Sequence, residues 1–170
     1  MPDFPRQAWF YIAGVIVLGG GLAAWQLWGL ELSSSFLLAW AILAVLDLLC
    51  ELYEIELIPG HATSAAIAVG AGAVLVGGTK MAVLVVLTGT LVAEAFLRRR
   101  IWRKDPSKYL TIVGFNVTQL LISIIIGGVV FQSLGGKPPP YASIIDFLRA
   151  FLLFGIFVTS NAAIVSGVVH

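Results

Sequence analysis

Residues 80–108 read KMAVLVVLTGTLVAEAFLRRRIWRKDPSK, an apolar stretch that runs directly into the most basic segment of the chain. The apolar part, 80–97, carries only two charged side chains, Lys80 at its start and Glu94 near its end. At 1.5 Å per residue, a helix of this length spans about 27 Å, close to the hydrocarbon core of a bilayer. The stretch therefore predicts a membrane-spanning helix that ends in a charged loop at one face of the bilayer.

Similar apolar segments fill the chain on both sides of this stretch. Hydrophobic residues make up 59% of the sequence and charged residues 11%, with a mean hydropathy of +1.00. Such a composition leaves too little polar surface to cover a soluble domain. We therefore expect an all-α integral membrane bundle of about six transmembrane helices, with residues 1–170 forming one transmembrane domain. The expected spans are about 8–28, 36–53, 63–77, 80–97, 109–134 and 144–168.

The charge distribution predicts the orientation of these spans. Six of the ten Lys and Arg residues lie in the loop 98–108. By the positive-inside rule this loop faces the cytoplasm. Alternation then places both termini and the connection 54–61 on the cytoplasmic side. The connections expected outside are 29–34, 77–80 and 135–141.

The first span has an alternative interpretation as a cleaved signal peptide. Gly21-Leu22-Ala23 resembles a cleavage site, in which small residues flank one larger residue. Asp3, however, offsets the charge of Arg6 in the segment that precedes the span. We therefore interpret the segment as a retained helix.

A group of polar side chains lies inside the predicted spans, at a depth where the bilayer contains no water. Counting along each helix places most of them within roughly 5–11 Å of one level in the cytoplasmic half. The outer half of the bundle is expected to hold almost nothing comparable. The group predicts a small polar pocket or hydrogen-bond network that opens towards the cytoplasm. The candidates are Asp47, Glu51, Asn116, Gln119 and Asn161, with Glu94 near the same level.

Glu94 and the basic loop also have simpler interpretations. Glu94 precedes Arg98 by four residues, the favourable order for an ion pair along a helix. The loop itself is a plausible contact for anionic lipid headgroups, although positive-inside charge alone is its commonest meaning. The candidates for headgroup contact are Arg98, Arg99, Arg100, Arg103 and Lys104.

The remaining candidates could equally be structural. Asp47 and Glu51 share one helix face, where like charges repel, so a cation or a proton is required nearby. Pairing with an arginine of the loop 98–103 is the alternative to a ligand site. Asn116 and Gln119 lie one turn apart, a spacing typical of hydrogen bonds between membrane helices.

Small residues and a polar connection distinguish the third span. Its Ala and Gly residues allow close approach of neighbouring helices, so we expect this span to be central and wholly enclosed. Before it, the connection 54–61 alternates polar and apolar residues and then reaches Pro59-Gly60, a pattern of a short extended segment at the interface. His61 has glutamates nearby but no second histidine, so no metal site is expected.

The residues also argue against several function classes. The sequence has no Gly-Lys-Ser/Thr phosphate loop, no Ser-His-Asp set and no zinc-ligand spacing. Neither His61 nor His170 lies well inside a span, as a haem ligand would. We expect no catalysis, no cofactor, no metal and no nucleic-acid partner. The bilayer is the expected environment, with another membrane protein or a small ligand as further partners.

The run from Asp47 to Gly136 resembles one family. Its features are an acidic helix end, the motif Ile-Pro-Gly-His-Ala-Thr-Ser at 58–64, a small-residue helix, a helix that ends in a carboxylate and arginines, and Phe-Asn-Val-Thr-Gln-Leu at 115–120. These resemble the N-terminal multi-span sensor region of bacterial signalling proteins with HD-GYP or GGDEF output domains. The resemblance covers about half the chain. It implies a bacterial inner-membrane module that senses a stimulus, here without an output domain.

The chain is also similar, in length and in Gly and Ala content, to the substrate-binding subunits of energy-coupling-factor vitamin transporters. Those subunits are six-helix bundles whose ligand sites lie towards the outside. Three functions are therefore expected as alternatives. The first is a non-catalytic sensory or small-ligand-binding module, the second an accessory subunit of a larger membrane complex, and the third a transporter substrate-binding subunit.

Overall fold

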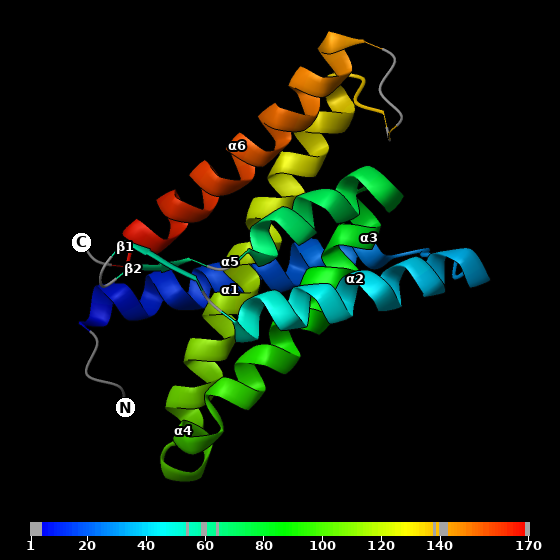
Figure 1. The fold of residues 1–170 in the computed structure, drawn as a ribbon. Coiled ribbons are helices and arrows are strands. Elements are labelled where there is room, and N and C mark those ends of the chain that lie inside the picture. The colour runs from blue at the N-terminus through cyan, green and yellow to red at the C-terminus, as the bar shows by residue number, and fades with distance from the viewer. Residues whose placement is uncertain are drawn as a thin grey trace.

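The computed structural model describes residues 5–53, 55–58, 61–63, 65–137, 139 and 143–168 (Figure 1). These residues form the all-α bundle of long apolar helices that the sequence predicts. One short antiparallel hairpin interrupts it, in which Ile55 pairs with Thr63. The elements are α1 (Arg6–Leu27), α2 (Ser34–Leu52), β1 (Ile55–Ile58), β2 (His61–Thr63), α3 (Ala66–Leu97), α4 (Arg99–Lys104), α5 (Pro106–Ser133) and α6 (Ile144–Ser166).

Polar side chains fix where the helices begin. At the start of α2, the Ser33 hydroxyl accepts a hydrogen bond of 3.2 Å from the backbone N–H of Phe36. At the start of α5, Asp105 Oδ1 accepts one of 2.9 Å from the backbone N–H of Lys108. Each cap satisfies a backbone donor that has no partner inside the helix. The apolar helices thus begin close to where the sequence predicts.

A bend divides α3 into two arms, 66–77 and 79–97. Gly78 has φ 76° and ψ −176°, values outside the helical region that a residue with a side chain rarely adopts. The arms correspond to the third and fourth predicted spans. The first arm is about 18 Å long and therefore shorter than a hydrocarbon core of about 30 Å. The two arms are separate helical segments joined at Gly78, and they share the label α3.

Five helices among the described residues are long and apolar enough to cross a membrane. They are α1, α2, α3, α5 and α6. Length and hydropathy of this kind in five helices make the chain a multi-pass membrane protein.

The centre of the bundle is formed by the second arm of α3 and by α5. The first arm is not wholly enclosed, so that expectation was wrong: Ala68 is exposed and Val76 is 57% exposed. The first arm packs one face, at Gly70, against Phe157 and Val86. Larger side chains of the second arm and of α5 occupy the centre instead. Residues that are 4% exposed or less include Met81, Val83, Val85, Val86, Leu121, Ile124 and Ile125.

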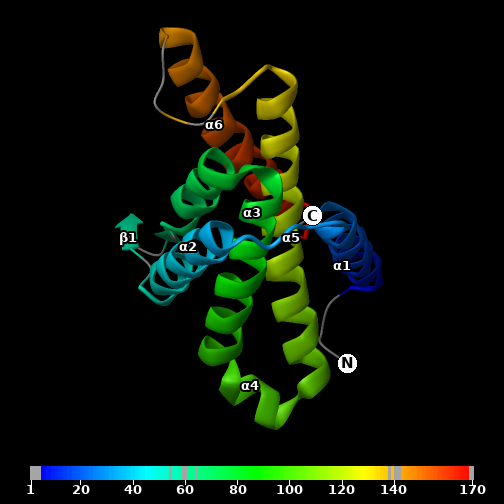
Figure 2. The same ribbon diagram turned by 90° about the vertical axis from the view of Figure 1, so that its right-hand side faces the viewer.

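The connections lie around the periphery of the bundle. Figure 1 shows the α1–α2 connection on the right, the α3 bend at the upper right and the α5–α6 connection at the top. The hairpin, the start of α1 and the end of α6 lie on the left, and α4 lies at the bottom. In Figure 2, α4 and the α5–α6 connection again lie at opposite extremes. We call the α4 side the basic end and the other side the turn end.

The connection between α2 and α3 is extended, as predicted, over 55–58 and 61–63. Glu54, Pro59, Gly60 and His170 lie outside the described residues. The start of α3 lies near Asp47 and Glu51 of α2, since Ala66 and Ile67 adjoin the same small space as these two residues.

The first and last helices are tied together near the side where the chain starts and finishes. The Tyr11 hydroxyl of α1 donates a hydrogen bond of 2.8 Å to the backbone carbonyl of Ile164 in α6. The ring of Tyr11 also lies directly against Gly167. These contacts close the bundle between residues 153 positions apart in the sequence.

Candidate functional site: the α3 seam and the turn-end cavity

Asp47 lies at the closest approach of α2 and α3. Its residue is 0% exposed, and its Oδ2 accepts a hydrogen bond of 3.2 Å from the Thr90 hydroxyl. Opposite it stands Gly89, where a Cβ would overlap the carboxylate of Asp47 and come within 3.0 Å of the Ala44 carbonyl oxygen. The backbone of α3 at Gly89 therefore contacts the Asp47 side chain of α2 directly. Small residues allow such a close approach between membrane helices.

The second carboxylate oxygen of Asp47, Oδ1, is buried without a hydrogen-bond partner. The expected ion pair with a loop arginine is absent among the described residues, because Arg98 turns to Glu94 instead. Glu51 adjoins the same space, but that space has no room for a water molecule. Its other walls are apolar and come from α3, α5 and α6: Ala66, Ile67, Val86, Leu120 and Phe157.

Glu94 forms the second polar centre, one turn further along α3. It makes the predicted ion pair with Arg98, and its side chain is 11% exposed. Its Oε1 also accepts a hydrogen bond of 2.9 Å from Asn116 Nδ2 on α5. Asn116 therefore joins two helices, as predicted, with Glu94 of α3 as its hydrogen-bond partner.

Together these contacts form a polar line along one face of α3. Thr90, Glu94 and Arg98 follow one another at four-residue spacing, which brings them to one side of a helix. Asp47 joins from α2 and Asn116 from α5. We call the set Asp47, Thr90, Glu94, Arg98 and Asn116 the α3 seam. Thr90 is a member that sequence reasoning missed, although its position one turn before Glu94 was visible.

The structure divides the predicted five-residue pocket. Asp47 and Glu51 adjoin one small space, and Asn116, Gln119 and Asn161 do not line it. Gln119 Oε1 and Asn161 Oδ1 are buried atoms without a hydrogen-bond partner, on α5 and α6. Packing separates these groups because apolar residues such as Leu120 and Phe157 fill the space between helices. A ligand role for any of them stays a prediction.

A larger cavity lies at the turn end. It has a volume of about 550 Å³, within the usual range for small-molecule sites. Its walls come from the α1–α2 connection, the α3 bend and the end of α5. We call it the turn-end cavity; it is lined by Gln26, Gly29, Leu30, Glu31, Phe36, Gly77, Gly78, Thr79, Lys80 and Gln132.

Lys80 holds one wall of this cavity in place. Its Nζ donates hydrogen bonds to the carbonyl oxygens of Trp28 at 3.2 Å and Gly29 at 3.4 Å. These carbonyls end α1 and have no partner further along the helix. Next to Lys80, the Thr79 hydroxyl lies against Gly128 of α5 and is buried without a hydrogen-bond partner. Sequence reasoning missed this cavity, because three separate connections build it.

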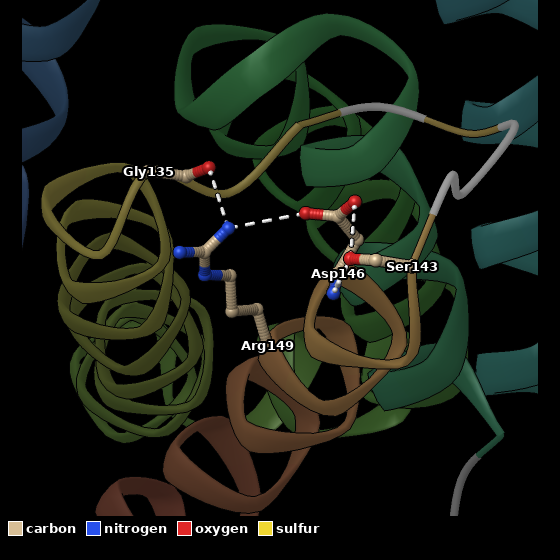
Figure 3. Close-up of polar contacts among 4 residues, drawn as sticks. All are labelled: Gly135, Ser143, Asp146 and Arg149. Atoms are coloured by element: carbon tan, nitrogen blue, oxygen red, sulfur yellow. Dashed lines mark hydrogen bonds and ion pairs between the residues drawn. The ribbon is translucent and has the colours of Figure 1, made fainter.

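The turn end also carries an ion pair on α6, shown in Figure 3. Ser143 caps the helix by accepting a hydrogen bond of 3.3 Å from the backbone N–H of Asp146. Asp146 Oδ1 lies 3.1 Å from Arg149 Nη1, which also donates to the Gly135 carbonyl at 3.3 Å. Sequence reasoning did not include Asp146 and Arg149, which lie at the start of the last predicted span. The Ser-x-x-Asp spacing of a helix cap was the signal that could have revealed this group.

The arginines and lysines of the basic end have different surroundings. Arg98 is held by Glu94, and the Arg99 guanidinium lies 4.6 Å from the centre of the Phe96 ring. Arg100 and Lys104 instead border a groove at the α4–α5 junction, whereas Arg103 is exposed outside it. Headgroup contact by these residues stays a prediction. The geometry favours Arg100 and Lys104, which border the groove.

In the ranges that the structure describes, no three His, Cys, Asp or Glu side chains come together as ligands for a metal ion. The α3 seam holds two carboxylates with Thr and Asn partners, a set suited to hydrogen bonding between helices. The turn-end cavity holds both charge signs and two amides, a set suited to a small polar molecule. Catalysis and cofactors are not tested by this geometry.

Fold and site define the class of this chain as a multi-pass helical membrane protein with buried polar contacts between helices. Comparisons with protein-family models, curated proteins and solved structures found no match. The resemblance to the sensor region of HD-GYP and GGDEF proteins stays a prediction.

Proposed function

We propose that this protein is a non-catalytic membrane module that binds a small polar ligand in the turn-end cavity. The observation that supports the proposal is the cavity itself, about 550 Å³ in volume, with polar side chains from three separate segments. Pockets of this size, with a few polar groups brought together from different elements, are typical of small-molecule sites.

The lining indicates which chemistry would fit. Glu31 brings a carboxylate and Lys80 an ammonium group, while Gln26 and Gln132 bring amides that both donate and accept. Phe36 adds an aromatic face. A zwitterionic molecule such as an amino acid would find a partner for each of its charges here. Its nonpolar part would contact Phe36.

The proposed orientation follows from the charge distribution. The loop 98–108 faces the cytoplasm by the positive-inside rule, so the turn-end cavity faces outwards. Both termini are then cytoplasmic, in the inner membrane of a bacterium. A module of this orientation would read a solute outside the cell, as a sensory protein does.

Sensing further requires that binding favours one arrangement of the helices. The cavity touches the α3 bend at Gly77, Gly78 and Thr79. The arm that follows the bend carries the Thr90, Glu94 and Arg98 positions of the seam. A ligand that contacts the bend would therefore change the angle between the two arms of α3. The contacts of that arm with α2 and α5 would change with it.

The test is a thermal unfolding series on the purified protein, with the twenty common amino acids as probes at millimolar concentration. We expect at least one probe to raise the midpoint by several degrees, because a ligand stabilises the state that binds it. The Glu31→Gln and Gln132→Leu variants should lose this increase. Gln7→Leu, at the other end of α1, is the matched control. The proposal is contradicted if no probe raises the midpoint, or if Gln7→Leu loses the effect equally.

A second candidate is an accessory subunit of a larger membrane complex. It is favoured by the outer faces of α2 and α6, whose candidate spans are only 6% and 11% buried within the chain. Lipid or a partner protein can cover such faces. Migration on a native gel separates the two: a stable large assembly supports the subunit, and a free monomer or dimer supports the module. A transporter subunit predicts the same outward cavity and would in addition move the probe across a membrane.

A further inference from the structure

The α4–α5 junction places three cations around one groove. Arg100 and Lys104 of α4 and Lys108 of α5 line a groove of about 340 Å³ together with Ile101 and Asp105. The side chains of these three cations are exposed, and they form no hydrogen bond or ion pair within the part of the chain that the structure describes. The groove therefore presents unneutralised positive charge.

The single carboxylate of the groove offsets only part of this charge. Asp105 Oδ1 already accepts from the backbone N–H of Lys108 at 2.9 Å and from the Ser107 hydroxyl at 3.0 Å. These bonds cap α5 and fix the angle at which α5 leaves α4. With three cations and one carboxylate, the groove has an excess of two positive charges.

The groove differs from the rest of the loop 98–108 in this respect. Arg98 is paired with Glu94, and Arg99 lies over the Phe96 ring. The ring of Trp102 stands edge-on to that of Tyr109, with 5.1 Å between the ring centres. Paired Trp and Tyr side chains at the end of membrane helices are typical of the headgroup level. The neighbouring Leu97 and Leu110 are 49% and 60% exposed, as acyl-chain contacts would be.

We propose that this groove binds the headgroup of an anionic phospholipid. Arg100, Lys104 and Lys108 would surround the phosphate, and Ile101 would contact the glycerol region. The commitment to an anionic lipid rests on the charge excess and on the position at the headgroup level. A zwitterionic headgroup carries its own cation, which three uncompensated cations would repel. Each basic residue near an anionic surface contributes about a five-fold preference.

The test compares lipid binding by native mass spectrometry of the detergent-solubilised protein. Phosphatidylglycerol and phosphatidylcholine with the same acyl chains are titrated separately. We expect the wild-type chain to prefer phosphatidylglycerol, and Arg100→Gln/Lys104→Gln to reduce that preference by about 25-fold, from two cations at five-fold each. Arg99→Gln/Arg103→Gln removes the same charge from the same short helix and should reduce the preference clearly less, because neither residue lines the groove.

Three outcomes would overturn the proposal. If both double variants reduce the preference equally, the attraction belongs to the whole basic loop and not to the groove. Equal binding of the two lipids by the wild-type chain would show that the groove does not select negative charge. Displacement of phosphatidylglycerol by inorganic phosphate at millimolar concentration would identify a site for soluble anions. Unfolding midpoints measured without added lipid serve as the control for folding. They should match the wild-type value, because the substituted positions are exposed.

Discussion

The carboxylate of Asp47 fits against the bare Cα of Gly89, so that α2 and α3 touch where neither has space for another side chain. This contact joins an acidic group to a small residue at the centre of the bundle. It holds Oδ2 of Asp47 within reach of the Thr90 hydroxyl, one residue further along α3.

Gly89→Ala is therefore expected to destabilise the bundle by about 1–3 kcal/mol, the usual cost of inserting a methyl group into a packed site. The added Cβ would lie 2.8 Å from the Cβ of Asp47, so α2 must shift. Gly72→Ala is the control on the same helix, since nothing lies within 4 Å of the position of its Cβ. Thermal or denaturant unfolding in detergent measures both. Equal stability of the two variants would contradict the close packing.

The hydrogen bond between Glu94 and Asn116 predicts an energetic coupling between α3 and α5. A double-mutant cycle with Glu94→Ala and Asn116→Ala should give a coupling of about 0.5–1.5 kcal/mol, the range for such bonds in membrane proteins. Replacing Asn116→Ala by Gln119→Ala provides the control cycle, because Gln119 Oε1 has no hydrogen-bond partner. If the coupling of Glu94 to Gln119 is larger than its coupling to Asn116, then Asn116 is not the residue of α5 that bonds to Glu94.

The bend of α3 predicts an unusual preference at Gly78. With φ at 76°, Gly78→Ala is expected to cost about 1–2 kcal/mol in unfolding free energy. Gly78→Asn should cost about as much, because ψ at −176° lies outside the αL region that Asn tolerates and in a region that is essentially restricted to Gly. Space is not the reason, because a Cβ here would lie 3.4 Å from Gln132 Nε2, an ordinary contact. A cost no larger than that of Gly72→Ala, at a position without a positive φ, would show that backbone conformation is not the constraint.

Asp105 predicts a loss of stability in acid. The backbone N–H of Lys108 and the Ser107 hydroxyl lower the pKa of Asp105 below its ordinary value. The unfolded chain then takes up the proton first, so this stabilisation is complete above the unfolded pKa of about 4 and is lost as the pH falls through the folded pKa. Asp105→Asn keeps a capping oxygen but does not titrate.

Unfolding midpoints between about pH 6 and pH 3 should therefore fall more for the wild type than for Asp105→Asn. All other carboxylates are shared by the two proteins, so the difference between the curves isolates the cap. Parallel curves would contradict the role of Asp105 as an ionised cap.

The sequence predicted those features that depend on neighbours in the chain. Apolar runs of bilayer length gave the helices, the Gly77-Gly78 pair marked the bend, and four-residue spacing gave the Glu94–Arg98 pair. These follow from helix geometry alone.

Features that depend on how helices pack could not be predicted in the same way. Asn116 had several acceptors at a similar depth, and only the crossing of α3 and α5 selects Glu94. The turn-end cavity needs segments 26–36, 77–80 and 132 to meet, which no local pattern encodes. The enclosed helix was misassigned for a related reason: small residues permit close packing, but they do not determine which helix is surrounded.

The bond from Tyr11 to Ile164 also means that the first part of α1 and the end of α6 are structural neighbours. Arg6 lies about 8 Å along α1 from Tyr11, and Gly167 touches the Tyr11 ring. A short peptide linker could therefore join the start of α1 to the end of α6, and new ends could be opened elsewhere. Circular permutation of this kind preserves the order of helices in space while changing their order of synthesis. The bundle would thereby become accessible to reporters fused at the connections between its helices.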